Sequence, residues 1–191
     1  GNKLLITSTG SALPINGSSD SYVNGKLFKD LAAGESFTFP IGGGGLWRYA
    51  GVRNTSGGAY QWCAEYFRNT PLAEADVDNL TPVFPVETIS QAEYWKISNN
   101  STGGTAEVRL SWGTESDVSP TFAVRESMVA VVWNDGTTAW EDFGGVNFSA
   151  GHTVDQGDFY SSLPVGFEER IITLGSTDPD NELPVELVFF T

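Results

Sequence analysis

The sequence predicts an all-β protein, an antiparallel β-sandwich of the jelly-roll type built as a single domain. Apolar and polar residues alternate over runs of about five to eight positions along the chain, and no segment shows the spacing of an amphipathic helix. The 22 Gly and 9 Pro suit the many tight turns that such a fold requires. The 12 Phe, 6 Tyr and 6 Trp among 191 residues supply enough apolar surface for one large core.

Each alternating run that is bounded by turn residues is predicted to be a strand. The predicted strands are Lys3–Thr7, Ser21–Lys29, Ser36–Pro40, Leu46–Arg53, Ala59–Phe67, Ala92–Ser98, Ala106–Trp112, Met128–Trp133, Ala139–Asp142, His152–Val154, Arg170–Leu174 and Glu186–Phe190. This number of strands is too large for one flat sheet. Two stacked antiparallel sheets can accommodate them, because each strand then buries one face against the other sheet. The pleat turns Val108, Leu110 and Trp112 inward, for example. Arg109 and Ser111, which alternate with them, point outward.

Glycine-containing segments mark several connections between these strands. Asn24-Gly25 and Asn134-Asp135-Gly136 each follow an apolar run and are typical of hairpin turns, in which a residue adopts positive φ. Gly42–Gly45 is predicted to be a flexible hairpin connection; in the alternative, its backbone approaches a bound ligand with Trp47 beside it. Asn69–Pro85 is the longest segment without a strand pattern, which predicts a surface loop with one helical turn.

The single module is predicted to span residues 1–191. Residues 1–20 form either an edge strand or a leader, and residues 183–191 form the last strand. Trp95 and Trp112 lie inside alternating strands, so both are predicted to be buried in the core.

The charge of the chain restricts its partners. The net charge is −14, and most of the acidic residues fall within residues 71–191. Such a surface repels nucleic-acid phosphates and anionic lipid head groups, which excludes nucleic acid as a partner. No run approaches the ~20 apolar residues that span a bilayer, so direct membrane insertion is not expected. The strong like charge also predicts a monomer.

Several short sequence phrases, each different, follow one another in a defined order along most of the chain. They are Tyr22–Gly25, Phe37–Gly42, Ala64–Phe67, Ile89-Ser90 with Glu93–Trp95, Leu110–Trp112, Ala130–Trp133 with Trp140, Ile172–Ser176 and Leu183–Leu187. The series resembles a β-rich module of large secreted and cell-surface proteins of Bacteroidetes, found shortly before the C-terminal sorting domain of the type IX secretion system. The resemblance implies export, an extracellular or cell-surface location and neighbouring domains in the same polypeptide. It implies no catalytic residues, and it suggests that residues 183–191 lead toward a sorting domain that this chain lacks.

No catalytic motif is recognisable. His152 is the only histidine, which excludes a two-histidine metal site, and no Gly-x-Ser-x-Gly motif accompanies it. Gly42–Gly45 lacks the Lys-Ser/Thr of a phosphate-binding loop. Cys63 is the only cysteine, so it forms no internal disulfide or multi-cysteine zinc site and is predicted to be a small core residue. No strand carries the alternating carboxylates expected of a sandwich-fold glycoside hydrolase.

The expected function is therefore that of a noncatalytic module in an exported multidomain surface protein. It serves as a scaffold, a spacer or an adhesion surface, and its partners are neighbouring domains and glycans or cell-surface proteins. The first alternative is a carbohydrate-binding module of a polysaccharide-degrading enzyme, because sugars stack on exposed aromatic rings while polar groups bind their hydroxyls. Trp47 and Trp140 are the candidate ligand-binding residues, since both lie next to turn sequence. The second alternative is a glycoside hydrolase-like enzyme.

Calcium is the one cofactor that the sequence suggests. Carboxylates in loops are the hard oxygen ligands that this ion selects, although neither acidic loop matches the spacing of an EF-hand. The alternative is ordinary solvated charge. The candidate ligands are Glu74, Asp76 and Asp78 in one loop and Asp178, Asp180 and Glu182 in the other.

Overall fold

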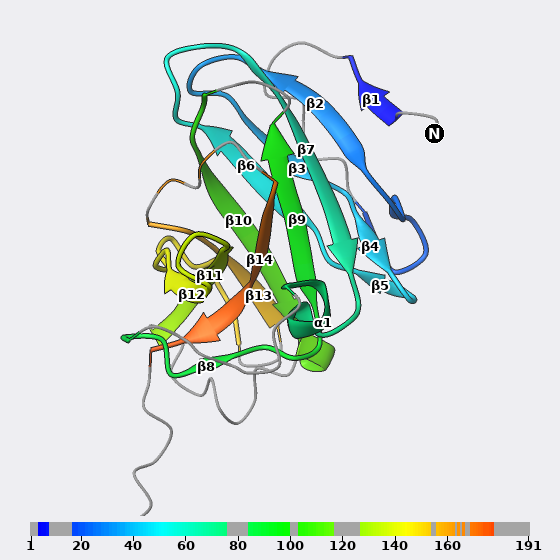
Figure 1. The fold of residues 1–191 in the computed structure, drawn as a ribbon. Coiled ribbons are helices and arrows are strands. Elements are labelled where there is room, and N and C mark those ends of the chain that lie inside the picture. The colour runs from blue at the N-terminus through cyan, green and yellow to red at the C-terminus, as the bar shows by residue number, and fades with distance from the viewer. Residues whose placement is uncertain are drawn as a thin grey trace, which may run out of the picture.

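Two β-sheets stacked face to face form the body of the protein (Figure 1), which confirms the predicted antiparallel sandwich. The structure is a computed structural model and describes residues 4–7, 17–75, 84–99, 103–116, 127–153, 156–162, 164, 166 and 169–177. The predicted last strand, residues 186–190, and the whole of residues 183–191 lie outside these ranges.

The larger sheet has the strand order β1-β2-β7-β9-β14-β11-β12, and β8 pairs with β14 beside this path. Its strands are β1 (Leu4–Ile6), β2 (Leu27–Leu31), β7 (Tyr60–Phe67), β8 (Thr88–Ile89), β9 (Tyr94–Asn99), β11 (Met128–Asn134), β12 (Ala139–Asp142) and β14 (Arg170–Ser176). All described pairs in this sheet are antiparallel except β1 with β2. The strand β1 lies at one edge.

The smaller sheet has the order β13-β10-β6-β3, and all its pairs are antiparallel. Its strands are β3 (Ser36–Phe39), β6 (Ala50–Asn54), β10 (Ala106–Gly113) and β13 (Gln156–Tyr160). A separate two-stranded hairpin consists of β4 (Gly42–Gly43) and β5 (Leu46–Trp47). Two short helices complete the described elements, α1 (Pro71–Ala75) and the 3-10 helix η1 (Thr114–Ser116), and neither is long enough to cross a membrane.

The main core lies between the two sheets. Trp95 from the larger sheet is fully buried and Trp112 from the smaller sheet is 3% exposed, which confirms both predictions. Val108 and Leu110 also point into this core, as the alternation predicts, and Cys63 is buried. Burial of each large apolar side chain contributes roughly 1.5–3 kcal/mol, so this cluster is the main source of the free energy of folding.

A second apolar cluster lies on the outer face of the larger sheet. Trp133 of β11 and Trp140 of β12 are register partners, and their rings are 5.2 Å apart. Leu72 of α1 and Ile89 of β8 pack against the same cluster. Trp140 is therefore fully buried, and the prediction that it is an exposed ligand-binding residue is wrong. The physical reason is that α1 and the segment around β8 cover this hairpin.

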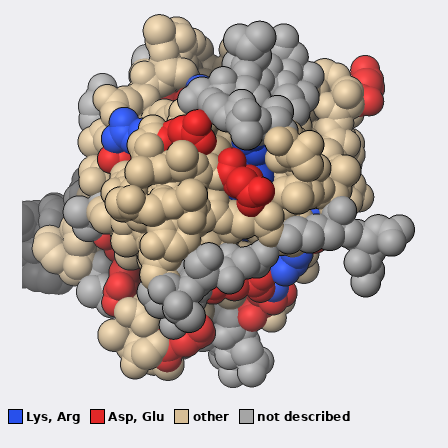
Figure 2. All heavy atoms as spheres, turned by 90° about the horizontal axis from the view of Figure 1, so that it is seen from above, with Lys and Arg blue, Asp and Glu red and all other residues tan. Residues whose placement is uncertain are grey.

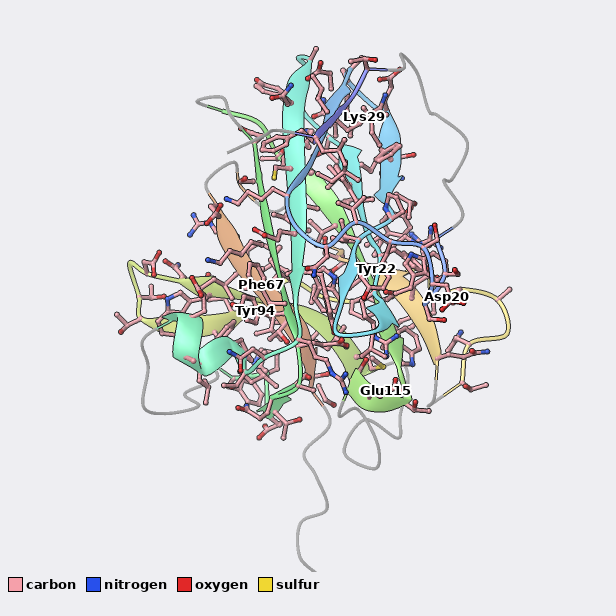
Figure 3. The ribbon with its side chains drawn as sticks, turned by 90° about the vertical axis from the view of Figure 1, so that its right-hand side faces the viewer. Asp20, Tyr22, Lys29, Phe67, Tyr94 and Glu115 are labelled. Carbon is pink, nitrogen blue, oxygen red and sulfur yellow. The ribbon has the colours of Figure 1, made fainter. Side chains whose placement is uncertain are left out.

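The outer face of the larger sheet also carries an aromatic pair near α1. Phe67 of β7 stacks on Tyr94 of β9 with ring centroids 4.7 Å apart and planes 6° apart, and Figure 3 shows the two side chains together beside the helix. Both rings are partly or fully covered, so the pair closes this end of the sheet and leaves little aromatic surface for a ligand.

Several predicted strand boundaries are wrong. The strand predicted at 21–29 begins at Leu27, because Val23 instead forms a parallel bridge with Ile41. Asn24-Gly25 is consequently not a hairpin turn. The strand predicted at 46–53 is interrupted between Trp47 and Ala50.

Three further strands were misplaced or missed. The strand predicted at 152–154 is reduced to an isolated bridge from Thr153 to Gln156, and the real strand β13 follows it. The short strands β4 and β8 have no alternating pattern and were not predicted.

Other connections agree with the sequence. Asn134 is the last residue of β11, and Asp135 and Gly136 lie in the turn that leads to β12, although the residue with positive φ is Thr138. Gly44 and Gly45 have φ of 59° and 83° and form the turn between β4 and β5, which confirms the predicted hairpin connection. The helical turn predicted within Asn69–Pro85 is α1.

Acidic side chains are dispersed over the described surface. In the view of Figure 2 they form separate groups, and basic side chains lie close to several of them. Ion pairs of the described residues include Lys26–Glu169, Arg53–Glu107, Lys96–Glu74 and Arg109–Asp158.

Candidate functional site

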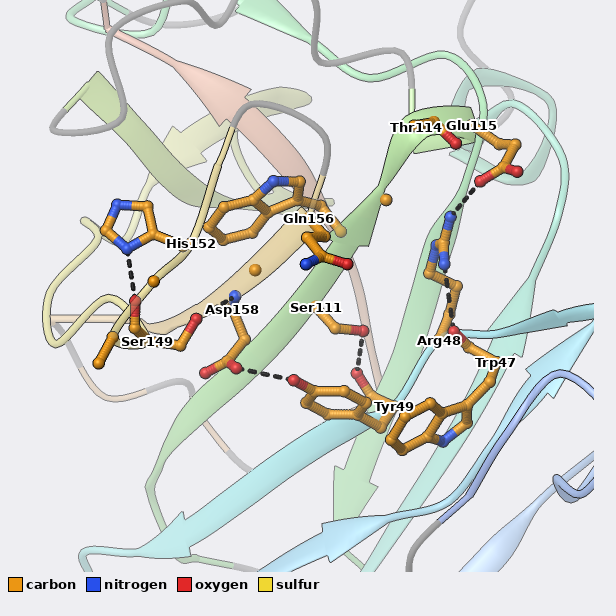
Figure 4. A pocket seen from close by; sticks show the side chains of 15 residues that line it. Trp47, Arg48, Tyr49, Ser111, Thr114, Glu115, Ser149, His152, Gln156 and Asp158 are labelled. Atoms are coloured by element: carbon orange, nitrogen blue, oxygen red, sulfur yellow. Dashed lines mark hydrogen bonds and ion pairs between the residues drawn. The ribbon is translucent and has the colours of Figure 1, made fainter.

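An open cleft of about 490 Å³ lies on the outer face of the smaller sheet (Figure 4). Three elements enclose it: the segment from β5 into β6, the end of β10 with η1, and the loop that precedes β13. Ser111 of β10 pairs in register with Asp158 of β13, and Gly113 pairs with Gln156. Side chains of alternate residues share a face of a strand, so Ser111, Asp158 and Gln156 point away from the core toward the cleft.

Trp47 and Tyr49 form the aromatic wall of the cleft. Their ring centroids are 4.8 Å apart with an interplanar angle of 44°, and both side chains are half-buried. The Trp47 ring packs against Gly17, where a Cβ atom would lie 2.2 Å from its Nε1. Only a glycine fits at position 17, and this contact fixes the indole against the body of the protein.

The floor of the cleft is a set of interlocked polar side chains. Asp158 accepts hydrogen bonds from the Tyr49 hydroxyl at 2.7 Å and from Arg109 Nε at 2.6 Å. The Ser111 hydroxyl donates to the Tyr49 carbonyl at 2.9 Å. Burial and the hydrogen bond to Asp158 raise the pKa of Tyr49, so its hydroxyl stays protonated and its ring keeps one orientation.

Arg48 points away from the aromatic wall and lies between the buried Glu93 and the partly exposed Glu115. Its Nη2 donates to Glu115 at 2.8 Å, its Nη1 to the Trp47 carbonyl at 3.2 Å, and its Nε lies 3.2 Å from Glu93. Tyr66 donates to Glu93 at 2.7 Å. Burial raises the pKa of Glu93, although Arg48 opposes this effect. Hydrogen bonds from the backbone and from side chains lower the pKa of Glu115.

The far wall of the cleft consists of the loop before β13. The His152 ring packs against Trp112 at 6.0 Å and Phe148 at 5.4 Å between centroids, and its Nδ1 contacts the Ser149 carbonyl. Trp112 donates from Nε1 to the Thr153 carbonyl at 3.1 Å. These contacts tie the loop to the core and place His152 at the cleft.

The structure separates the two predicted ligand-binding residues. Trp47 lies in the cleft, whereas Trp140 is buried on the outer face of the other sheet. The sequence did not single out Arg48, Ser111 or Asp158. The one sequence signal for Arg48 is its position between Trp47 and Tyr49, whose side chains point to the opposite face. Asp158 was missed because it belongs to β13, which the alternation of apolar and polar residues placed wrongly.

The candidate calcium ligands are only partly described. Glu74 forms an ion pair with Lys96 and accepts a hydrogen bond from Tyr94 at 3.2 Å, and the hydrogen bond to Lys96 lowers its pKa. Asp76, Asp78, Asp178, Asp180 and Glu182 lie outside the described residues. Within the described ranges, no group of three or more His, Cys, Asp or Glu side chains is arranged to hold a metal ion. Calcium binding stays a prediction.

The chain matches no protein-family model, no curated protein and no solved structure. The chemistry of the cleft therefore has to be inferred from its own side chains. The carboxylates that line it belong to Glu115 and Asp158, and each accepts a hydrogen bond from an arginine. The cleft thus combines a stacked aromatic wall with hydrogen-bonding groups held in fixed positions.

Proposed function

We propose that the chain is a noncatalytic glycan-binding module and that the cleft on the smaller sheet binds a neutral carbohydrate. One observation carries the proposal: the half-buried aromatic pair Trp47 and Tyr49 lies beside fixed polar groups in an open cleft. The C–H face of a sugar ring stacks on an aromatic ring, and its hydroxyls pair with such polar groups.

The polar groups of the cleft suit hydroxyl recognition. Gln156 is exposed at the mouth and offers both a donor and an acceptor, and the Ser111 hydroxyl lies on the floor. Tyr49 and Asp158 are already locked to each other, so little side-chain freedom is lost when a ligand binds. The site is rigid before binding, which favours affinity for a ligand that forms few contacts.

The charges around the cleft favour a neutral ligand. Arg48 is already paired with Glu115 and Glu93, and Arg109 is paired with Asp158. No unpaired cation lines the described part of the cleft, and the whole chain carries −14. A glycan with carboxylate or sulfate groups would be repelled at long range.

The resemblance to exported surface modules supports the same proposal from another direction. A glycan-binding surface on such a protein would attach it to a polysaccharide or to another cell. The neighbouring domains of the same polypeptide would then supply any further activity.

The test is a screen of the intact chain against an array of neutral and acidic glycans, followed by calorimetry on the neutral polysaccharides that bind. Trp47→Ala removes the stacking surface and should weaken binding by roughly tenfold or more, which is about 1.4 kcal/mol. Phe84→Ala is the matched control, because Phe84 is an 85% exposed aromatic that precedes β8 on the other sheet.

Three results would overturn the proposal. The first is that no neutral glycan binds, which would favour a scaffold or spacer role. The second is that Trp47→Ala binds as well as the wild type. The third is that Phe84→Ala loses as much affinity as Trp47→Ala.

A further inference from the structure

A row of side chains continues from the cleft across the outer face of the smaller sheet. The guanidinium carbon of Arg109 lies 5.3 Å from the centroid of the Tyr49 ring and 5.6 Å from that of the Tyr160 ring. Trp47, Tyr49, Arg109 and Tyr160 therefore form one connected series, with Trp47 and Tyr49 at the cleft end. We call these four residues the aromatic row.

The register of the sheet fixes the row. Arg109 of β10 is the partner of Tyr160 on β13 and of Gly51 on β6, so the three residues share one face. A Cβ atom on Gly51 would lie 2.8 Å from the Cβ of Arg109, and 3.3 Å from its Cδ. The absence of a side chain at Gly51 lets Arg109 lie across the sheet between the two tyrosines.

Arg109 also has hydrogen-bonding capacity to spare. Its Nε donates to Asp158, while its Nη1 and Nη2 groups have no hydrogen-bond partner among the described residues. The side chain is 27% exposed, and Tyr160 is half-buried. Along the row, the rings of Trp47 and Tyr49 offer a first stacking surface, Arg109 offers unused N–H donors, and the Tyr160 ring offers a second stacking surface.

We propose that the ligand is an extended glycan chain that occupies the cleft and continues along the aromatic row. This proposal rests on the proposed function and adds the class of glycan: the interior of a polysaccharide, not a single terminal sugar. A monosaccharide or disaccharide fills the cleft beside Trp47, and later sugars reach Arg109 and Tyr160. Arg109 is 27% exposed and Tyr160 is half-buried, so the glycan chain can reach both residues from the cleft.

The test is calorimetry on the intact chain with cello-, xylo-, manno- and laminari-oligosaccharides of two to six sugar residues. For the series that binds, affinity should rise roughly tenfold between the disaccharide and the hexasaccharide, about 1.4 kcal/mol. Tyr160→Ala should weaken hexasaccharide binding about fivefold or more and leave disaccharide binding unchanged. Tyr160→Phe keeps the ring and should bind both as the wild type does.

Arg109→Met keeps the aliphatic stem over Gly51 but removes the free donors and also the hydrogen bond to Asp158 on the cleft floor, so it should weaken binding of both lengths and weaken hexasaccharide binding more. A thermal melt of each variant establishes that it is folded. If affinity is the same for every length, or if Tyr160→Ala weakens both lengths equally, the extended site is contradicted while the glycan-binding cleft stands. If no oligosaccharide or polysaccharide binds at all, both proposals fall.

Discussion

At the scale of single residues, Arg48 has the largest structural role in the site. Its side chain is 10% exposed, donates hydrogen bonds to Glu115 and to the Trp47 carbonyl, and places Nε within 3.2 Å of Glu93. Trp95 donates from Nε1 to the Arg48 carbonyl at 3.1 Å, which ties this segment to the core. A buried charge that is paired in this way is costly to break, because the remaining partner is left without compensation. Arg48 therefore positions Trp47 and Tyr49 on either side of it.

Glu93 gives this network a predictable response to pH. Its pKa is raised in the folded protein by burial, so the folded state binds the proton more tightly than the unfolded chain does. The stability that Glu93 contributes is full below its unfolded pKa of about 4.5 and declines as the pH rises through the folded value. We expect the unfolding free energy of the wild type, minus that of Glu93→Gln, to fall between pH 4 and pH 8 in denaturant titrations.

Glu115→Gln is the control for this measurement. The pKa of Glu115 is lowered, so its contribution is present above its unfolded pKa and is lost as the pH falls. The two variants should therefore change with pH in opposite directions. A difference for Glu93→Gln that stays constant or rises with pH would contradict the assignment.

Substitution of individual tryptophans should distinguish those in the core from the one in the cleft. Trp95 and Trp140 are fully buried, so replacing either by Ala should cost about 3–5 kcal/mol of unfolding free energy. Trp47 is half-buried at the cleft, and Trp47→Ala should cost less unfolding free energy than either. Chemical denaturation of the three variants checks this order. Equal losses at Trp47 and Trp95 would mean that Trp47 is a core residue and unsuited to bind a ligand.

At the scale of secondary-structure elements, the placement of β13 decides whether the cleft exists. Gly157 in this strand has no side chain, and a Cβ there would lie 2.3 Å from the Trp112 ring and 2.6 Å from the Cβ of His152. The strand therefore brings Asp158 to the cleft floor and Gln156 to the cleft mouth only because Trp112 is able to lie over Gly157.

Gly157→Ala tests this dependence. The added methyl group should displace Trp112 and His152, lower the unfolding free energy by about 1–3 kcal/mol and weaken glycan binding. Gly57→Ala is the matched control, because nothing lies within 4 Å of a Cβ at that position. The control should stay within about 0.5 kcal/mol of the wild type. Binding that survives Gly157→Ala undiminished would show that the far wall takes no part in recognition.

The same elements show what the sequence was able to predict. Alternation placed Trp95 and Trp112 in the core correctly, because a strand between two layers must bury every second residue. The position of Trp140 next to turn sequence predicted an exposed ring, and this was wrong because α1 and β8 come from elsewhere in the chain and cover the hairpin. Alternation misplaced β13, whose Gly157 and Asp158 are weak strand formers, and with it the residue that organises the cleft floor.

At the scale of the whole molecule, the sandwich separates two outer faces of different character. The larger sheet is covered at one end by α1, β8 and their apolar cluster. The smaller sheet leaves an open face with a cleft and the aromatic row. The chain carries a net charge of −14, which keeps like molecules apart in solution.

Calcium bound by the two acidic loops would reduce the repulsion between their carboxylates and stabilise the folded state. A thermal melt should then show a higher melting temperature with calcium than with magnesium at equal ionic strength, because magnesium demands a rigid octahedral site. An ion at one hundred times its dissociation constant stabilises the folded state by about 2.7 kcal/mol. Equal shifts with the two ions, or none, would show that the loops carry ordinary solvated charge.

The most direct test of the glycan-binding cleft is an NMR titration of the intact chain with a neutral hexasaccharide, followed through the indole N–H signals of the 6 tryptophans. The signals of Trp47 and Trp112 should move in proportion to saturation, because both residues line the cleft. Those of Trp133 and Trp140 should stay fixed, since they lie on the outer face of the other sheet. Movement at Trp133 and Trp140 with none at Trp47, or no movement at any indole across the neutral glycans, would contradict the account.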